Sequence, residues 1–333
     1  MYHVPNGALV VPASLSDLHE VLKFTSLKPV LARNLPSLSA RARTNATTVV
    51  IGDLHEIEDA LKVWGDRPKV AIGESLAGCD FAIPSGTEFG FLTATSAPRG
   101  AEPFVIGDVH NCHRTLSTLL ERLNITPGIP KESDRLLVFV GDLVDKGGTD
   151  PLDPLQTLDL VHRLHLAGQA VVVRGNHEQM LLRRFLGTSP ESPSSQRSVD
   201  AVKSSSSSAT LLRWLGCLPL AFRLPDLSGV PMTVVHATAT SFAFDEGFKA
   251  RRHAEQSCLF GRPTSNPLPG IAVHGHWEVP DVVCSLEKNR IVVNVDTGAC
   301  MGNKLSALDA SILPEPGQVA SVSVPTDPLD LQA

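Results

Sequence analysis

Three short hydrophobic runs between residues 104 and 178 place the strongest constraint on the fold, because each run stops at residue types that bind metal ions. The segments are Phe104–His110, Leu136–Gly147 and Ala170–Glu178, and their polar ends read GDVH, GDLVDKG and RGNHE. Short continuous apolar runs are typical of strands with both faces buried, as in a parallel sheet. We therefore predict three neighbouring parallel strands with polar side chains at their carboxyl ends.

The residues between these runs have the periodicity of helices. One apolar face is formed by Leu116, Leu119, Leu120 and Leu123, a spacing that predicts a helix. Residues 151–166 predict a second helix, which Gly168 ends. Strands that alternate with helices pair in parallel through crossover connections. Ligands of such sheets collect at the carboxyl ends of the strands, which is where the three polar motifs lie.

Further strands and helices follow residue 178. Two apolar runs end at histidines, in Met232–His236 and in Ile271–His276. These endings place two more clusters of metal-binding residue types at strand ends. The other expected elements are helices at Glu178–Leu186 and Leu211–Leu215 and strands at Ile291–Val295 and Leu305–Leu308.

Composition divides the chain into regions. Residues 85–103 are rich in Gly, Pro, Ser and Thr and predict a linker. We predict an N-terminal α/β domain of unknown role (1–96), with strands at 9–11 and 49–51. The predicted main domain (103–312) follows and contains a Ser-rich flexible insertion (187–210). The last residues (313–333) are expected to form a disordered Pro-rich tail.

An early stretch, Val49–His55, repeats the pattern of the first motif, with Asp53 and His55 in place of Asp108 and His110. Asp108 precedes Asp142 by 142 − 108 = 34 residues, which is room for one helix and a strand. Asp53 precedes it by 142 − 53 = 89 residues, which would need a large insertion. We therefore assign the first motif to the later copy and interpret the earlier one as a strand end and a surface turn.

The overall composition is that of a globular protein, with 42% hydrophobic and 19% charged residues. The formal net charge of −6 gives no reason to expect nucleic acid or anionic lipid as a partner. Six dispersed cysteines without a CxxC pair argue against a zinc ribbon or a disulfide framework and fit a reducing compartment. Neither a signal peptide nor an apolar stretch long enough for a membrane helix is apparent, so a cytoplasmic location is expected.

Six residues at strand ends are candidate metal ligands: Asp108, His110, Asp142, Asn176, His236 and His276. Carboxylates, imidazoles and an amide form a mixed oxygen and nitrogen set that suits Mn²⁺, Fe²⁺ or Zn²⁺. Six ligands are enough for two ions about 3.5–4 Å apart if one carboxylate bridges them, and Asp142 on the middle strand is the natural bridge. Such a pair lowers the pKa of a shared water to give hydroxide at neutral pH and clamps phosphoryl oxygens.

A leaving oxygen also needs a proton and the phosphate needs a counter-charge. His177 follows the ligand Asn176 and is the candidate general acid. Asp145, three residues after Asp142, is placed to hold His177 as an imidazolium. Lys146 and an arginine from further along the chain could neutralise the phosphate.

The ordered motifs GDVH, GDLVDKG, RGNHEQM, VVH and GHW resemble those of the calcineurin-like metallophosphoesterases. Within these, they are most similar to the phosphoprotein phosphatase branch, with its phage and bacterial Ser/Thr phosphatases and its diadenosine tetraphosphatases. The likeness covers about residues 104–309. It implies a double β-sandwich flanked by helices in four layers, a mixed α/β (α+β) fold.

The resemblance also implies a role for each site residue. Asp108 and His110 would bind the first metal, Asp142 would bridge, and the second metal would be bound by Asn176, His236 and His276. His177 with Asp145 would be the acid pair, and Arg262 falls where phage-type enzymes carry a phosphate-binding arginine. Manganese is the expected metal, with iron or zinc as alternatives.

Two departures from the family pattern bear on function. Asn111 replaces a glycine, and Asn is the residue that best tolerates the backbone angles glycine allows. Lys146 replaces an arginine and loses its bidentate fork; the resemblance associates this lysine with the branch that cleaves nucleoside polyphosphates. We expect a Ser/Thr protein phosphatase, with a dinucleoside polyphosphate hydrolase as the alternative and an inactive phosphate-binding scaffold as the third possibility.

Overall fold

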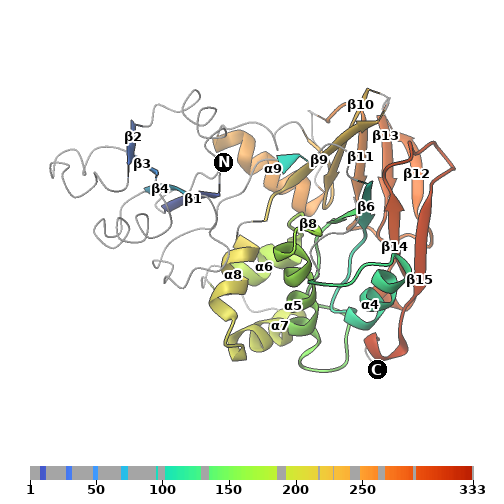
Figure 1. Ribbon diagram of the computed structural model, residues 1–333, viewed down its shortest axis with the longest axis horizontal. Coiled ribbons are helices and arrows are strands. Elements are labelled where there is room, and N and C mark those ends of the chain that lie inside the picture. The colour runs from blue at the N-terminus through green and yellow to red at the C-terminus, as the bar shows by residue number, and fades with distance from the viewer. Residues whose placement is uncertain are drawn as a thin grey trace. The chain divides into compact units, whose positions relative to one another are not determined.

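The computed structural model of the chain (Figure 1) divides into two compact units. One comprises Met1–Leu92 with Ser207–Leu218, and the other comprises Thr93–Ser206 with Pro219–Ala333. The residues that the structure describes are 8–12, 28–31, 48–51, 69–73, 95–96, 102–128, 135–185, 193–216, 218–227, 229–240, 248–261, 267–287 and 290–331.

The first unit contains a four-stranded parallel sheet. Its strand order is β1 (Ala8–Pro12), β4 (Lys69–Gly73), β3 (Thr48–Ile51) and β2 (Lys28–Leu31). The strands expected at 9–11 and 49–51 correspond to β1 and β3. Asp53 and His55, which follow β3, lie outside the described residues. Helix α8 (Ser208–Gly216) belongs to the same unit, and it includes the residues 211–215 that the sequence predicts to be helical.

The second unit is built on two sheets, and the first of them carries the three motifs of the opening segment. Its order is β15 (Ser321–Pro325), β14 (Lys304–Asp309), β6 (Glu102–Ile106), β7 (Arg135–Phe139) and β8 (Ala170–Val172). As predicted, β6, β7 and β8 pair in parallel, with Phe104 opposite Leu137 and Leu137 opposite Ala170. The carboxyl ends of these strands therefore share one edge.

The second sheet carries the two histidine motifs. Its order is β12 (Val283–Glu287), β13 (Arg290–Asn294), β11 (Ile271–His274), β10 (Val230–Val235), β9 (Ala221–Leu227) and β5 (Thr95–Ser96). β10, β11 and β13 are parallel to one another. His236 and His276 consequently follow neighbouring parallel strands.

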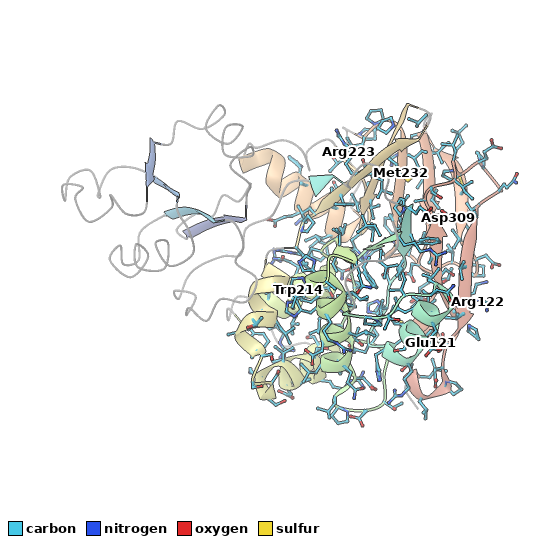
Figure 2. The ribbon with its side chains drawn as sticks, in the orientation of Figure 1. Glu121, Arg122, Trp214, Arg223, Met232 and Asp309 are labelled. Carbon is cyan, nitrogen blue, oxygen red and sulfur yellow. The ribbon has the colours of Figure 1, made fainter. Side chains whose placement is uncertain are left out.

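The two sheets face each other across one hydrophobic core. Val105 and Val138 of the five-stranded sheet belong to the same buried cluster as Met232 and Val273 of the six-stranded sheet. Figure 2 shows Met232 on the six-stranded sheet. Helices cover the outer side of the five-stranded sheet. They are α4 (His113–Arg122) against β14 and β15, α5 (Asp153–Leu166) against β8, and α6 (Asn176–Phe185) and α7 (Pro193–Ser204), which pack together. Two sheets flanked by helices confirm the predicted fold class.

The Ser-rich stretch differs from the prediction of a flexible insertion. Most of its described part forms α7, which packs against α5 and α6, and its last residues begin α8. Ser198, Val199 and Val202 are buried, because their spacing puts them on one face of the helix. Serine-rich composition is not a barrier to helix formation where a face of this kind can be covered by neighbouring helices.

The C-terminal segment also differs from the predicted disordered tail. β15 pairs antiparallel with β14, and a short 3₁₀ helix, η4 (Pro328–Asp330), follows it. The Asp330 carboxylate is buried and accepts hydrogen bonds from the backbone nitrogen and hydroxyl of Thr115, each at 2.7 Å. Strand pairing and this buried acceptor hold the segment against α4. Among the described residues, every helix is too short or too polar to cross a bilayer.

Candidate metal centre

The six predicted ligands meet at the shared carboxyl edge of the strands. Asp108 and His110 follow β6, Asp142 follows β7, and Asn176 begins α6 directly after β8. His236 and His276 follow β10 and β11 of the facing sheet. All but His276 are buried. The edge therefore concentrates metal-binding groups from both sheets in one place.

The backbone takes strained conformations to bring these side chains together. His110, Asp142 and His276 have φ values of 45°, 51° and 72°, a region costly for residues with a Cβ. Asn111 has φ 63°, which is the physical reason why asparagine can replace the family's glycine there. Gly275 lies so close that a Cβ would collide with the Asp108 carboxylate. Strain and close approach at one edge mark it as a functional site.

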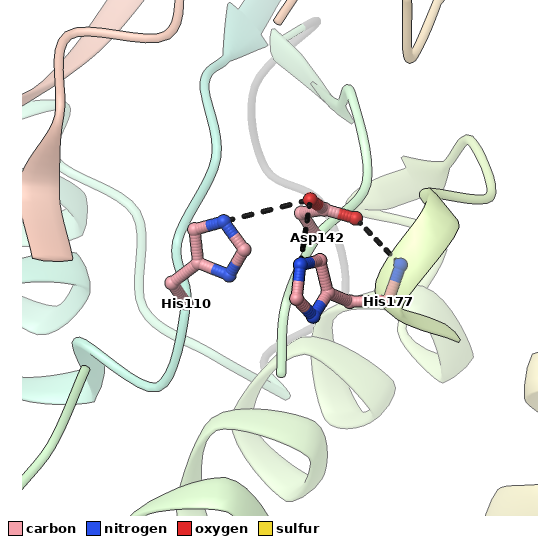
Figure 3. Close-up of side chains that lie close together, drawn as sticks. All are labelled: His110, Asp142 and His177. Carbon is pink, nitrogen blue, oxygen red and sulfur yellow. Dashed lines mark hydrogen bonds and ion pairs between the residues drawn. The ribbon is translucent and has the colours of Figure 1, made fainter. Parts of the chain in front are cut away.

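The Asp142 carboxylate lies at the middle of this edge (Figure 3). Its Oδ2 atom is 3.5 Å from Nε2 of His110, 3.4 Å from Nε2 of His236 and 3.9 Å from Nε2 of His177. Its Oδ1 atom accepts a hydrogen bond of 3.0 Å from the backbone nitrogen of His177. One carboxylate thus faces imidazoles from three different parts of the chain, a central position that suits a bridging ligand.

His110 presents its Nε2 lone pair to the site. Its Nδ1 donates to the carbonyl oxygen of Val144 at 2.9 Å, which fixes the tautomer. Nε2 lies 4.0 Å from Oδ2 of Asp108 and accepts from Nζ of Lys146 at 2.9 Å. Burial lowers the pKa of His110 to about 3. The imidazole is therefore neutral at physiological pH, as a metal ligand must be.

A second cluster lies beside the first. Nε2 of His236 is 2.7 Å from Oδ1 of Asn176 and 3.1 Å from Nδ1 of His276, and Nδ1 of His276 is 3.1 Å from the same Asn176 oxygen. Nδ1 of His236 donates to the carbonyl of Val140 at 3.1 Å, so its Nε2 is an acceptor. Burial also lowers the pKa of His276 to about 4.

The arrangement of donor atoms in the two clusters fits divalent cations. Two acceptors, Asn176 Oδ1 and His236 Nε2, point at each other, and a single proton on His276 could satisfy only part of the cluster. Burial, together with the carboxylates of Asp296 and Asp142, raises the pKa of Asp108 well above its usual range. Converging acceptors and crowded carboxylates are relieved by positive charge, so the donor set fits two cations.

His177 differs from the predicted histidine ligands in its hydrogen-bond partner and in the direction of its pKa shift. Its Nδ1 donates to Oδ2 of Asp145 at 2.8 Å, and both residues are buried. Burial lowers the pKa of His177, but Asp142 and Asp145 outweigh it, and the net shift is upward. The ligand atoms of His177, His110 and Asp142 lie within 4.8 Å of one another, so the geometry alone allows His177 either to bind a metal or to carry a proton. Its hydrogen bond to Asp145 favours the charged form of the ring.

Sequence reasoning missed three residues that hold the site in place. Glu178 is fully buried, and its carboxylate accepts from the backbone nitrogens of Asp142, Leu143 and Gly175 at 2.8–2.9 Å. Its place directly after Asn176 and His177 was the available signal. The other two residues, Arg197 and Ser198, come from α7.

Arg197 and Ser198 brace the loop that carries Asp145 and Lys146. The Arg197 guanidinium donates to the carbonyl oxygens of Lys146, Gly147 and Gly148. The Ser198 hydroxyl accepts from the backbone nitrogen of Asp145 at 3.2 Å. No local signal in a Ser-rich stretch could have identified these contacts, because they join residues about 50 positions apart. The remaining predicted site residue, Arg262, lies outside the described residues.

Several proteins of known description are similar to this chain. The chain is 31% identical over 167 residues to a symmetrical bis(5'-nucleosyl)-tetraphosphatase of Coxiella burnetii, covering 50% of this chain and 49% of that protein. It is 28% identical over 225 residues to an asymmetrical bis(5'-nucleosyl)-tetraphosphatase of Oceanobacillus iheyensis, covering 61% of this chain and 86% of that protein. It thus spans about half the length of the first of these relatives.

A crystal structure provisionally described as a diadenosine tetraphosphatase is also similar, with 19% identity and a TM-score of 0.46, over 72% of this chain and 100% of that chain. Residues 104–295 match the model of the calcineurin-like phosphoesterase family. This match covers more than half of the chain and includes all six candidate ligands. The chain therefore belongs to the calcineurin-like phosphoesterases, a family of metal-dependent hydrolases of phosphoester bonds.

Proposed function

We propose that this protein hydrolyses dinucleoside polyphosphates at a centre that holds two divalent metal ions. Asp108 and His110 would hold one ion, Asn176, His236 and His276 would hold the other, and Asp142 lies where it could contribute to both. The mixed oxygen and nitrogen donors suit Mn²⁺, Fe²⁺ or Zn²⁺, and the resemblance of the motifs to the phosphoprotein phosphatase branch favours Mn²⁺ among them. The bound ions supply an activated water and charge neutralisation for the phosphoryl oxygens.

In this proposal the protein's own residues handle the proton and the substrate charge. His177 gives the proton on its Nε2 to the leaving phosphate oxygen, and Asp145 holds the ring by its Nδ1. Lys146 reaches the centre, with its Nζ 2.9 Å from Nε2 of His110. Its ammonium, and the guanidinium of Arg262, would bind phosphate oxygens that the reaction does not cleave.

The choice of substrate rests on one observation, the activity named for the relatives to which this chain is similar. Both curated relatives described above are bis(5'-nucleosyl)-tetraphosphatases. Lys146 supports the same choice. Its ammonium is a compact charge on a flexible side chain and can contact different oxygens of a polyphosphate, whereas the planar guanidinium of an arginine suits bidentate binding of one terminal phosphate. The Ser/Thr phosphatase expected from the sequence motifs has no comparable support and becomes the competing outcome of the test.

A competition assay decides between the two substrates. Mn²⁺-loaded protein would be incubated with diadenosine tetraphosphate and a phosphoserine peptide together, and both followed by mass spectrometry. We expect nucleotide products with the peptide intact, and no products from an Asp142→Asn control. Loss of peptide phosphate with the dinucleotide intact would establish the protein phosphatase instead. Absence of both reactions, with no metal by elemental analysis, would leave the inactive scaffold.

Lys146→Arg provides a second test of the same choice. The bidentate fork should favour a terminal phosphate, so the variant should gain phosphomonoesterase activity relative to dinucleotide hydrolysis. The ratio of the two rates is the measurement, because it cancels differences in active fraction. An unchanged ratio would show that residue 146 does not contribute to the choice of substrate.

A further inference from the structure

A cavity of about 280 Å³ lies next to the metal centre, on the outer face of the six-stranded sheet. It begins where two ligand-bearing segments end, since Ala237 follows His236 and Trp277 follows His276, and both line it. Its volume is slightly below the range of about 300–1,000 Å³ that holds drug-sized ligands. The cavity is therefore of a size for one ring system rather than for a peptide.

The register of the sheet builds the floor of this cavity. Ala272 pairs with Val292, and Val292 pairs with Ser285, so these side chains form one row on the outer face. Successive rows on one face lie two residues apart along the strands. Ala272 and Val292 supply the apolar part of the floor, and Ser285 with His274 and Asn294 of the next row adds polar groups. The small Ala272 side chain leaves room for the flat face of a ring.

Trp277 forms the end nearest the metal centre. Its ring centroid is 5.1 Å from that of His276 and 5.7 Å from that of His274. Gly261 approaches it so closely that a Cβ would collide with the indole. The indole nevertheless remains 46% exposed. An anchored aromatic ring with an open surface is a platform for stacking.

The far end of the cavity carries hydrogen-bonding groups of both kinds. Arg290 and Glu287 pair across β13 and β12 and both line the cavity. The Arg290 guanidinium donates to the carbonyl of Ala239 at 3.2 Å, whereas its Nε is buried and has no hydrogen-bond partner among the residues that the structure describes. The Glu287 carboxylate would repel a second phosphate group. A donor and an acceptor side by side suit the edge of a heterocyclic base, which carries groups of both kinds.

We propose that this cavity, between Trp277 and the Arg290–Glu287 pair, binds a nucleobase of the substrate, with Trp277 as the stacking surface. The inference rests on the proposed function, because it takes the ligand to be the nucleoside part of a nucleotide whose phosphates reach the metal centre. It assigns selection for nucleotides over other phosphoesters to residues outside the metal centre.

Binding of two probes to Mn²⁺-loaded protein tests the assignment by calorimetry. Adenosine 5'-monophosphate carries the base, and ribose 5-phosphate lacks it but keeps the phosphate that the metal centre binds. We expect the nucleotide to bind at least about tenfold more tightly, as base stacking on an aromatic side chain predicts. Trp277→Ala should bring this ratio close to one and leave the affinity for ribose 5-phosphate unchanged. Trp277→Phe should retain most of the preference.

Two further variants separate the cavity from the metal centre. Ala272→Leu fills the floor and should weaken nucleotide binding alone. Leu286→Ala, on the same strand as Ser285 but exposed and outside the cavity, should change neither affinity. Equal affinity of the two probes for the unmodified protein would overturn the proposal, as would a Trp277→Ala variant that loses both probes equally. If the base preference holds but diadenosine tetraphosphate is not hydrolysed, the cavity stands and the proposed function fails.

Discussion

Nδ1 of His177 lies 2.8 Å from Oδ2 of Asp145, and the two side chains are buried together beside the Asp142 carboxylate. The bond fixes which nitrogen faces the metal centre and stabilises the charged form of the imidazole. Asp145 has a backbone φ of 68°, and its backbone nitrogen donates to the Ser198 hydroxyl, so the fold holds the main chain from which this carboxylate reaches His177.

The pH profile of turnover should depend on Asp145. Burial lowers the pKa of His177, but Asp142 and Asp145 raise it further, and the result lies above its usual value of 6.5. A general acid works while it is protonated, so kcat should fall as pH rises through this raised pKa. In Asp145→Asn the pKa drops, and the falling limb should move to lower pH. Profiles of kcat against pH would show this; superimposable profiles would contradict it.

Replacement of the acid itself should separate chemistry from metal binding. His177→Asn should keep the metal content of the unmodified protein and lower kcat by about 10²- to 10⁴-fold, the usual contribution of a general acid. Elemental analysis after dialysis and steady-state kinetics on the same sample would measure both. Loss of metal from this variant would mean that His177 is a ligand.

Asp142→Asn should abolish metal retention and turnover together. Its Oδ2 is within 3.4–3.9 Å of three imidazole nitrogens, and an amide there removes the negative charge that the two cations share. Elemental analysis should find a loss of both ions relative to an Asp281→Asn control, whose carboxylate is 77% exposed. Full metal content with lost activity would contradict a bridging role.

Glu178→Gln should destabilise the protein. The amide nitrogen of glutamine cannot accept a hydrogen bond, so at least one of the backbone nitrogens of Asp142, Leu143 and Gly175 would lose its partner. A buried unsatisfied donor costs about 1–3 kcal/mol, and urea unfolding of the metal-free protein would measure it. Glu121→Gln on the exposed face of α4 is the matched control. Equal stability of the two variants would show that the three bonds are dispensable.

Arg197→Met should weaken catalysis through the loop that follows Asp142. The guanidinium donates to the carbonyl oxygens of three successive residues, 146–148, and methionine keeps the unbranched stem of the side chain without these bonds. Misplacement of Lys146 by about 1 Å could lower kcat/KM by up to 100-fold. Arg122→Met on α4 should have no effect. A normal kcat/KM for Arg197→Met would contradict a positioning role of α7.

The sequence by itself determined the parts of this protein that depend on local pattern. β6, β7 and β8 are short apolar runs that end at polar motifs, and such runs become buried parallel strands for reasons that act within a few residues. The ordered motifs predicted the family and the residues that gather at the centre, because side chains at the ends of adjacent parallel strands share one edge.

Only the tertiary structure decided the rest, since those features depend on contacts between distant residues. α7 is a helix because its buried face meets α5 and α6, although its composition suggests a flexible segment. The C-terminal strand is ordered because β14 offers an open edge and Thr115 offers donors to Asp330. The Arg197 brace and the cavity floor follow from helix packing and strand register, which composition and periodicity do not encode.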